Sequence, residues 1–157
     1  MTTQEQSILA GRRFLRGMSP QHIARLAEVC KHVSLPVHYR LFEEGGTADK
    51  FWLIDAGQVA LDAMVPGDGR LVIETLGRGD VVGLSWQLPP YQWHYGAITT
   101  QPMQAFEMDA KAVRAACEDD PGLGYELTRR FLALTVQRLQ VTRERLLEKC
   151  ADSASSS

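Results

Sequence analysis

The chain has 157 residues, of which 45% are hydrophobic and 23% are charged, and its formal net charge is −2 at pH 7. A chain of this length suits a single domain with a core large enough to fold without disulfides. No apolar run approaches the roughly 20 residues that a membrane-spanning helix needs, and the net charge gives no overall attraction to nucleic-acid phosphates.

The cysteines and the N-terminus indicate a reducing compartment. Cys30, Cys117 and Cys150 are odd in number, far apart and without C-x-x-C spacing, so they predict neither a disulfide framework nor a zinc site. The first residues are polar and then basic, without the apolar core of a signal peptide. We therefore expect a cytoplasmic protein with reduced thiols, no bound metal and no association with a membrane.

The N-terminal part of the chain predicts helices followed by a strand. Its polar beginning suits a loose helix, and Ser19 and Pro20 form a strong helix start, with serine as the N-cap and proline in the first turn. A helix of about three turns should follow. Apolar residues then alternate from Val33 to Leu41, which predicts a half-buried strand with Pro36 at an edge or a bend.

Glycines punctuate the middle of the chain, with short β-rich runs between them. This spacing is near the roughly 8–12 residues of small antiparallel domains and predicts a barrel, a sandwich or a jelly roll. The runs are FWLID, QVALDAM, RLVIETL and DVVG, and residues 96–108 supply two more possible strands, broken at Gln101-Pro102. We expect a mainly β domain with flanking helices.

Helical periodicity returns at Asp109 and continues almost to the end of the chain. Asp109 can cap a short helix, and Asp120-Pro121 repeats the cap-then-proline start for a long helix over residues 121–148. This helix has too many apolar positions for one stripe, so one face should cover the β domain and the other should form a coiled-coil-like homodimer. We expect one domain over residues 1–150 and a disordered tail over residues 151–157.

One segment, Gly77–Ala97 with the sequence GRGDVVGLSWQLPPYQWHYGA, combines glycine turns, two prolines, a histidine and large aromatic residues that include Trp86, Tyr91 and Trp93. We call it the cassette segment. Its prolines remove two backbone donors and favour extended geometry in the preceding residues, so it cannot stay regular for long. Core or lid packing is the more frequent role for Trp86, Tyr91 and Trp93, and a ligand cage is the alternative. The segment is either a binding loop or a plug.

Four stretches carry a recognisable pattern: FLRGMSPQHIARLAEVC, LFEEGGTADKFWLIDAGQVAL, GDGRLVIETLGRGDVVG and DPGLGYELTRRFLALTVQRLQVTRERL. Their order resembles the cyclic-nucleotide-binding domain of the catabolite-activator (Crp/Fnr) superfamily over residues 14–147. The resemblance implies an eight-stranded β-roll of the jelly-roll, or double-stranded β-helix, type. N-terminal helices and a long, dimerising C-terminal helix should flank it.

The resemblance also implies a ligand site with altered chemistry. In that family a glycine turn receives the cyclic phosphate, a glutamate accepts a hydrogen bond from the ribose, and an arginine pairs with the phosphate. When the family pattern is aligned with this sequence without gaps, its glycine corresponds to Gly83. Its glutamate corresponds to Leu84 and its arginine to His94. Both charged groups are replaced, so we expect tight cAMP binding to be lost. The implied ligand positions are Gly83, Leu84, Ser85, Trp86, His94 and Tyr95, with possible base-capping by Leu139, Gln140 and Arg143.

The leading interpretation is a non-enzymatic, single-domain regulatory module that needs no cofactor and acts through a protein partner. The sequence contains no G-x-S-x-G, H-E-x-x-H or P-loop motif. One alternative is a genuine sensor of cAMP, cGMP or another small ligand. The other is the sensor domain of a transcription regulator. Such relatives carry a helix-turn-helix after the long helix, whereas a serine-rich tail stands here, so no DNA-reading element is expected in this chain.

Overall fold

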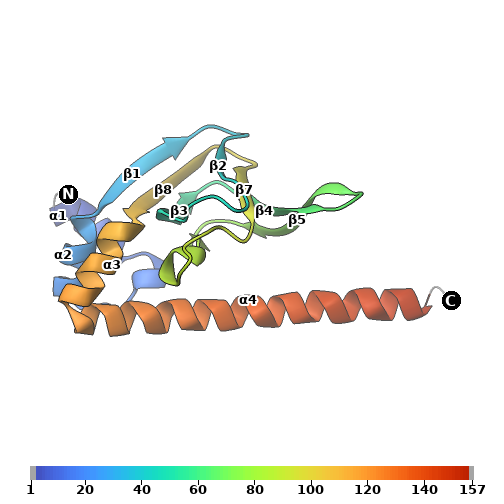
Figure 1. Ribbon diagram of the computed structural model, residues 1–157. Coiled ribbons are helices and arrows are strands. Elements are labelled where there is room, and N and C mark those ends of the chain that lie inside the picture. The colour runs from blue at the N-terminus through green and yellow to red at the C-terminus, as the bar shows by residue number, and fades with distance from the viewer. Residues whose placement is uncertain (1–2, 156–157) are drawn as a thin grey trace.

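The computed structural model describes residues 3–155 (Figure 1). The helical elements are α1 (Thr3–Ala10), the 3-10 turn η1 (Arg13–Leu15), α2 (Pro20–Ala27), the 3-10 turn η2 (Ser85–Gln87), α3 (Ala110–Asp119) and α4 (Pro121–Ser155). The strands are β1 (Cys30–Leu35), β2 (Arg40–Phe42), β3 (Lys50–Ala56), β4 (Val59–Val65), β5 (Gly69–Leu76), β6 (Val81–Val82), β7 (Gly96–Thr99) and β8 (Met103–Asp109).

The strands within residues 3–155 form two four-stranded antiparallel sheets. Their orders are β1-β8-β3-β6 and β2-β7-β4-β5. Most neighbours are not consecutive in the sequence, because the chain passes back and forth between the two sheets as it does in a jelly roll. The predicted class, a mainly β roll with flanking helices, is confirmed. The two strands expected within residues 96–108 are β7 and β8.

The N-terminal helix α2 begins where the sequence predicts. The Ser19 side chain accepts a hydrogen bond from the backbone N–H of His22 (3.4 Å), and Pro20 occupies the first turn. The helix has eight residues, a little over two turns instead of about three. The alternating segment after it forms two strands, β1 and β2, because Pro36 follows β1 and His38 has a φ of 63° that interrupts the ladder.

Aspartates start both C-terminal helices, as predicted. The Asp109 carboxylate accepts a hydrogen bond from the backbone N–H of Ala112 (3.1 Å) at the start of α3. At the start of α4, the Asp120 carboxylate accepts from the backbone N–H groups of Gly122 (3.1 Å) and Leu123 (3.3 Å). These bonds satisfy amides that have no partner within their own helix.

The long helix α4 continues further than expected. Its predicted end near residue 148 is wrong, and residues 151–155 of the expected disordered tail are helical. No glycine or proline follows Gly124 to stop the helix, and alanine and serine are tolerated within it. Residues 156 and 157 of that tail lie outside the described residues. Among residues 3–155, no helix is both long enough and apolar enough to cross a bilayer.

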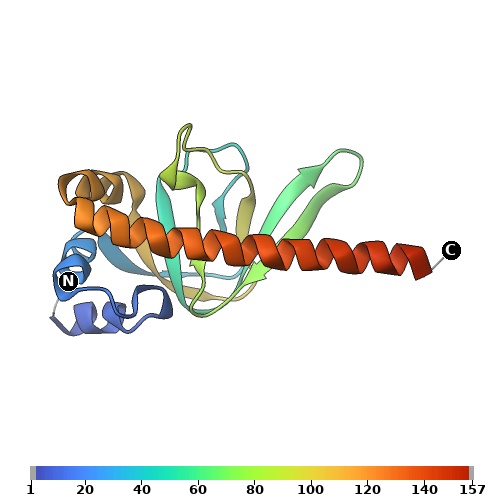
Figure 2. The same cartoon turned by 90° about the horizontal axis from the view of Figure 1, so that it is seen from below.

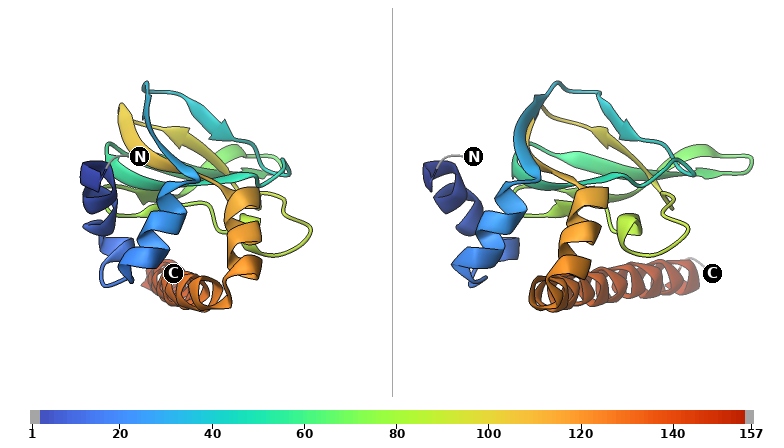
Figure 3. Two further views of the ribbon diagram at one scale, coloured as in Figure 1. Left: turned by 90° about the vertical axis from the view of Figure 1, so that its left-hand side faces the viewer. Right: turned by 60° about the vertical axis from the view of Figure 1, so that its left-hand side comes forward.

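The helices pack on one side and at one end of the roll. Figures 1 and 2 show α4 running along the roll and extending past the β4–β5 hairpin. Figure 3 shows α1, α2 and α3 gathered at the end where α4 begins. The sheet that contains β3 therefore has the helices on one face and the roll interior on the other.

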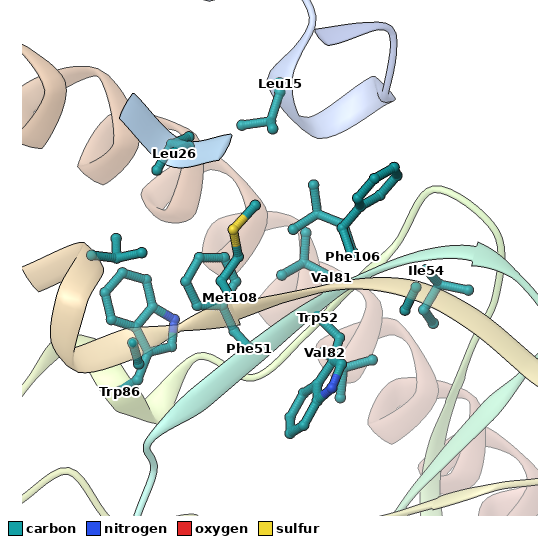
Figure 4. Close-up of a cluster of buried hydrophobic side chains, with 14 of the residues drawn as sticks. Leu15, Leu26, Phe51, Trp52, Ile54, Val81, Val82, Trp86, Phe106 and Met108 are labelled. Atoms are coloured by element: carbon teal, nitrogen blue, oxygen red, sulfur yellow. The ribbon is translucent and has the colours of Figure 1, made fainter. Parts of the chain in front are cut away.

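The core follows from this two-sided burial of β3. Successive strand residues point to opposite faces, so Phe51 packs towards the helices and Trp52 into the roll. Phe51 contacts the ring of Phe131 on α4, edge to face, with 5.4 Å between ring centroids. Figure 4 shows Phe51, Met108 and Trp86 close together on the helix side, with Trp52 on the other side of the strand. Trp86, in the middle of the cassette segment, thus belongs to the main core.

Candidate functional site

A hydrogen-bonded turn leads the chain from β5 into β6 and sets the start of the cassette segment. The Asp80 carboxylate accepts a hydrogen bond from the backbone N–H of Gly77 (2.8 Å). The Arg13 guanidinium donates to the same carboxylate (2.9 Å) and ties the turn to η1. β6 then pairs with β3 and ends immediately before Gly83. Two elements distant in sequence therefore determine where Gly83 lies.

Gly83 stands at a point where a side chain would not fit. Its φ is 106°, and a Cβ placed there would lie 3.0 Å from the ring of Trp93 and 3.2 Å from the Cβ of Phe51. Both the backbone conformation and the close packing require glycine. The 3-10 turn η2 follows, closed by the Gln87 side-chain amide, which donates to the carbonyl of Leu84 (3.2 Å). This packing explains Gly83 even without a ligand.

Trp86 belongs to the core beneath the helices. Its ring stacks on Phe51 with 4.6 Å between centroids and an 8° angle between the planes, and Phe131 meets it edge to face at 5.2 Å. Only 4% of Trp86 is exposed. The side chain predicted as a possible cage wall therefore anchors η2 between β3 and α4.

Trp93 fills the roll interior. Its ring stacks on Phe42 with 3.7 Å between centroids, and Trp52 lies beyond at 6.4 Å. Tyr91 is half-buried on the outer side of the segment, where the Arg114 guanidinium lies 4.0 Å from the centre of its ring. The three rings do not line one common cavity, because Trp93 lines the space beside Gly83 whereas Trp86 and Tyr91 lie outside it.

His94 and Ser85 form a polar pair on the surface. The Ser85 hydroxyl and Nδ1 of His94 lie 2.9 Å apart, within hydrogen-bond distance, and His94 is exposed. The imidazole therefore fixes the position of the serine. In the part of the chain that the structure describes, no group of three or more His, Cys, Asp or Glu residues could hold a metal ion.

A cavity of about 40 Å³ remains beside the glycine turn. It is lined by Phe42, Leu61, Gly83, Leu84, Ser85, Trp93, Tyr95 and Arg138. The structure thus brings together four of the predicted ligand positions, Gly83, Leu84, Ser85 and Tyr95. Trp86 and His94 do not line this space. The volume admits water but lies far below the roughly 300–1,000 Å³ of typical ligand pockets.

Among the described residues that line this cavity, Arg138 of α4 is the only one with a cationic side chain. The Arg138 guanidinium donates a hydrogen bond to the backbone carbonyl of Val81. Burial lowers the pKa of Arg138, and the nearby carboxylates of Glu74 and Asp80 partly offset that effect. Arg138 is not among the ligand positions predicted from the sequence. The available signal was helical spacing, since Arg138 lies seven residues after the buried Phe131 and hence on the same helix face.

The three positions expected to cap a base lie elsewhere on α4. Leu139 is 68% exposed, and Gln140 and Arg143 are also exposed. None of the three lines the cavity, because the helix face that meets the roll carries Arg138.

A buried carboxylate closes the other part of the roll interior. Glu107 on β8 accepts a hydrogen bond from the indole N–H of Trp52 (3.0 Å), and the ammonium groups of Lys50 and Lys31 lie 3.2 and 3.4 Å from it. Burial alone would raise the pKa of Glu107, but the Trp52 hydrogen bond and the two lysines outweigh it and lower the pKa.

We expect the Glu107 carboxylate to make the free energy of unfolding fall more steeply as the pH is lowered. Because the pKa of Glu107 is lower in the folded chain, its stabilisation is present above about pH 4.3, the ordinary glutamate value, and is lost as the pH falls through the folded value. Glu107→Gln should cost about 1–2 kcal/mol at pH 7 and flatten the acid limb of a plot of unfolding free energy against pH. Urea titrations between pH 7 and pH 3 measure this, and parallel curves for the two proteins would refute it.

Comparison with known proteins gives one consistent similarity. A family model described as the cyclic nucleotide-binding domain matches residues 32–120. The chain is 26% identical over 141 residues to a CRP-like cAMP-activated global transcriptional regulator of Mycobacterium tuberculosis. The aligned part covers 90% of this chain and 61% of the regulator, so the chain spans about three fifths of that relative's length.

Solved structures agree in fold. A putative cyclic nucleotide-binding protein from Geobacter metallireducens superimposes with a TM-score of 0.78 at 22% identity, covering 88% of this chain and 99% of that one. The sensor domain of the transcriptional regulator DNR from Pseudomonas aeruginosa superimposes with a TM-score of 0.68 at 19% identity, covering 87% and 92%. At these identities the superpositions establish the shape of the roll and its helices.

Proposed function

Because the chain belongs to the cyclic nucleotide-binding domain family, we propose that it is a non-enzymatic regulatory module whose cassette segment no longer takes a cyclic nucleotide in the family's usual pose. It acts as a homodimer and through a protein partner. The observation that carries the proposal is the 40 Å³ cavity at Gly83, which the stacked pair Trp93 and Phe42 leaves too small for a nucleotide.

Altered charge supports the same conclusion. Leu84 stands at the position where the resemblance expects a ribose acceptor, and it offers no hydrogen-bonding side chain. His94 stands at the arginine position, is exposed and is hydrogen-bonded to Ser85. Each ligand polar group left without a partner costs about 1–3 kcal/mol, so two such losses weaken binding by roughly one to four orders of magnitude.

Titration calorimetry with cAMP and with cGMP tests the proposal. We expect no heat of binding at millimolar nucleotide at either pH 6 or pH 8, because the cavity is closed and both charged determinants are replaced. Micromolar binding at either pH would refute this, and its loss in His94→Gln would favour a sensor that depends on His94.

Arg138 favours a second candidate function, the sensing of a small anionic ligand. Its guanidinium lines the cavity beside Gly83 and Ser85, where it could pair with a phosphate or carboxylate if Trp93 moved. Binding by this route should be lost in Arg138→Gln and retained in His94→Gln. The same pair of variants separates it from a sensor that depends on His94.

Exposed apolar side chains support dimerisation and a protein partner. On α4 they recur at heptad spacing, and the β4–β5 hairpin carries a second group. Soluble proteins seldom expose such groups together unless another surface covers them. The exposed large hydrophobic residues are Tyr125, Leu132, Val136, Leu139, Leu146 and Leu147 on α4, and Met64, Leu71, Val72 and Ile73 on the hairpin. The similarity to the Mycobacterium regulator supports a third candidate function, in which this chain is the sensor part of a transcription regulator.

A further inference from the structure

A second cavity, outside the roll, lies between α3, α4 and the cassette segment. Its volume is about 180 Å³, and it shares no lining residue with the cavity at Gly83. The lining residues are Trp86, Gln87, Tyr91, Arg114, Cys117, Glu118, Leu127, Thr128 and Phe131. Three separate elements therefore meet around one space.

One part of the lining is aromatic and apolar. Trp86 and Phe131 lie edge to face with 5.2 Å between ring centroids, and Leu127 is buried beside them. An apolar protein cavity of about 150 Å³ holds one benzene ring. The space is therefore of the size that one aromatic ring occupies, and its lining offers flat faces against which such a ring can pack.

The other part of the lining offers hydrogen-bond donors. The indole Nε1 of Trp86 is buried and has no hydrogen-bond partner among the described residues. Buried donors are almost always paired, but this nitrogen has almost no accessible surface, so an acceptor in the cavity reaches it only after the indole ring moves. Arg114 is held at the rim by a hydrogen bond to the Trp86 carbonyl (2.6 Å) and by the Tyr91 ring beneath it, which leaves its guanidinium with further donors.

We propose that this cavity binds a small planar aromatic compound that carries one carbonyl or carboxylate oxygen. The ring lies against Trp86 and Phe131, and the oxygen accepts hydrogen bonds from the indole N–H and from Arg114. The site lies outside the roll and does not depend on the function proposed above. A bound ring contacts η2, α3 and α4 together, so it fastens the cassette segment to both helices and raises the midpoint of thermal unfolding.

Benzamide, benzoate and benzylamine test the chemistry, because they share one ring and differ in the attached group. Benzamide and benzoate present an acceptor oxygen, whereas benzylamine presents only donors. We expect Kd values in the millimolar range for the first two, given their size, and at least about tenfold weaker binding of benzylamine. NMR titration of the full chain and the shift of its thermal midpoint measure this.

Two variants locate the site. Thr128→Trp places a large ring at the cavity rim and should weaken benzamide binding about tenfold or more. Thr142→Trp makes the same change about four turns further along α4, at an exposed position that does not line the cavity, and should leave binding unchanged. Trp86→Phe keeps a ring but removes the indole donor, and should reduce the preference for benzamide over benzylamine while circular dichroism confirms folding.

Other results would overturn the proposal. Absence of binding by all three compounds at millimolar concentration shows that the cavity does not admit a ring. Equal binding of benzylamine and benzamide removes the assigned role of the two donors. Equal effects of Thr128→Trp and Thr142→Trp place the ring elsewhere on the molecule.

Discussion

Replacing Phe131 by alanine is expected to lower the free energy of unfolding by about 3–5 kcal/mol, the usual cost of truncating a fully buried phenylalanine. Only 1% of Phe131 is exposed. Its ring meets Phe14 of η1 at 4.8 Å, Phe51 of β3 at 5.4 Å and Trp86 of η2 at 5.2 Å, all edge to face. One side chain of α4 therefore joins the N-terminal helices, the roll and the cassette segment.

Chemical denaturation of Phe131→Ala and of a matched variant, Gln137→Ala, measures this effect. Gln137 is exposed on the same helix, so its truncation should change the unfolding free energy by no more than about 0.5 kcal/mol. Equal losses in the two variants would show that α4 does not pack on the roll through Phe131.

Placing charges on the outer face of α4 is expected to convert a dimer into a monomer. Leu132, Leu139 and Leu146 recur every seven residues, and Val136 falls between the first two, four residues after Leu132. This is the spacing of a coiled-coil seam, and it lies on an exposed side of α4, roughly 100° around the helix from the buried Phe131. Leu132→Glu combined with Leu139→Glu would bury four carboxylates in the dimer, which outweighs the gain from the remaining apolar contacts.

Sedimentation at micromolar concentration compares this double variant with Gln137→Glu/Gln140→Glu, which adds the same charge at exposed positions of α4 outside the seam. We expect the control to remain dimeric. A wild-type chain that sediments as a monomer would refute the proposed dimer.

A native cysteine reports the orientation of the two helices. Cys150 follows Leu146 by four residues, on the same face, and it is exposed. In a parallel dimer mild oxidation should join two Cys150 side chains, and Cys150→Ser should abolish the cross-link. Burial raises the pKa of Cys30 to about 12 and also raises the pKa of Cys117. Both thiols therefore ionise less readily, and they form disulfides more slowly than an exposed cysteine does. Absence of the cross-link would favour an antiparallel arrangement.

Much of the architecture could be predicted from local patterns. Ser19, Asp109 and Asp120 carry the capping chemistry that starts a helix, and all three do so in the structure. Glycine spacing and β-rich runs identify the strands, and the resemblance supplies their arrangement as a roll. These features depend on residues close together in the sequence, or on a family pattern that spans the whole chain.

Features that depend on packing between distant segments could not be predicted. Trp93 and Phe42 are about fifty residues apart in sequence, and nothing local indicates that their rings stack in the roll interior. Arg138 reaches the glycine turn because α4 presents the Phe131 face to the roll, a choice between two apolar faces that the helix pattern leaves open. The predicted end of α4 is wrong because a serine-rich composition is typical of disorder, although no residue there stops a helix.

The most direct test of the account is titration calorimetry with cAMP on two rebuilt proteins. Leu84→Glu with His94→Arg restores the family's charged groups but leaves Trp93 in place. The same pair combined with Trp93→Ala also empties the space beside Phe42, at a cost in stability of about 3–5 kcal/mol. We predict that the double variant does not bind cAMP and that the triple variant does. Micromolar binding by the double variant would contradict the conclusion that aromatic packing closes the site.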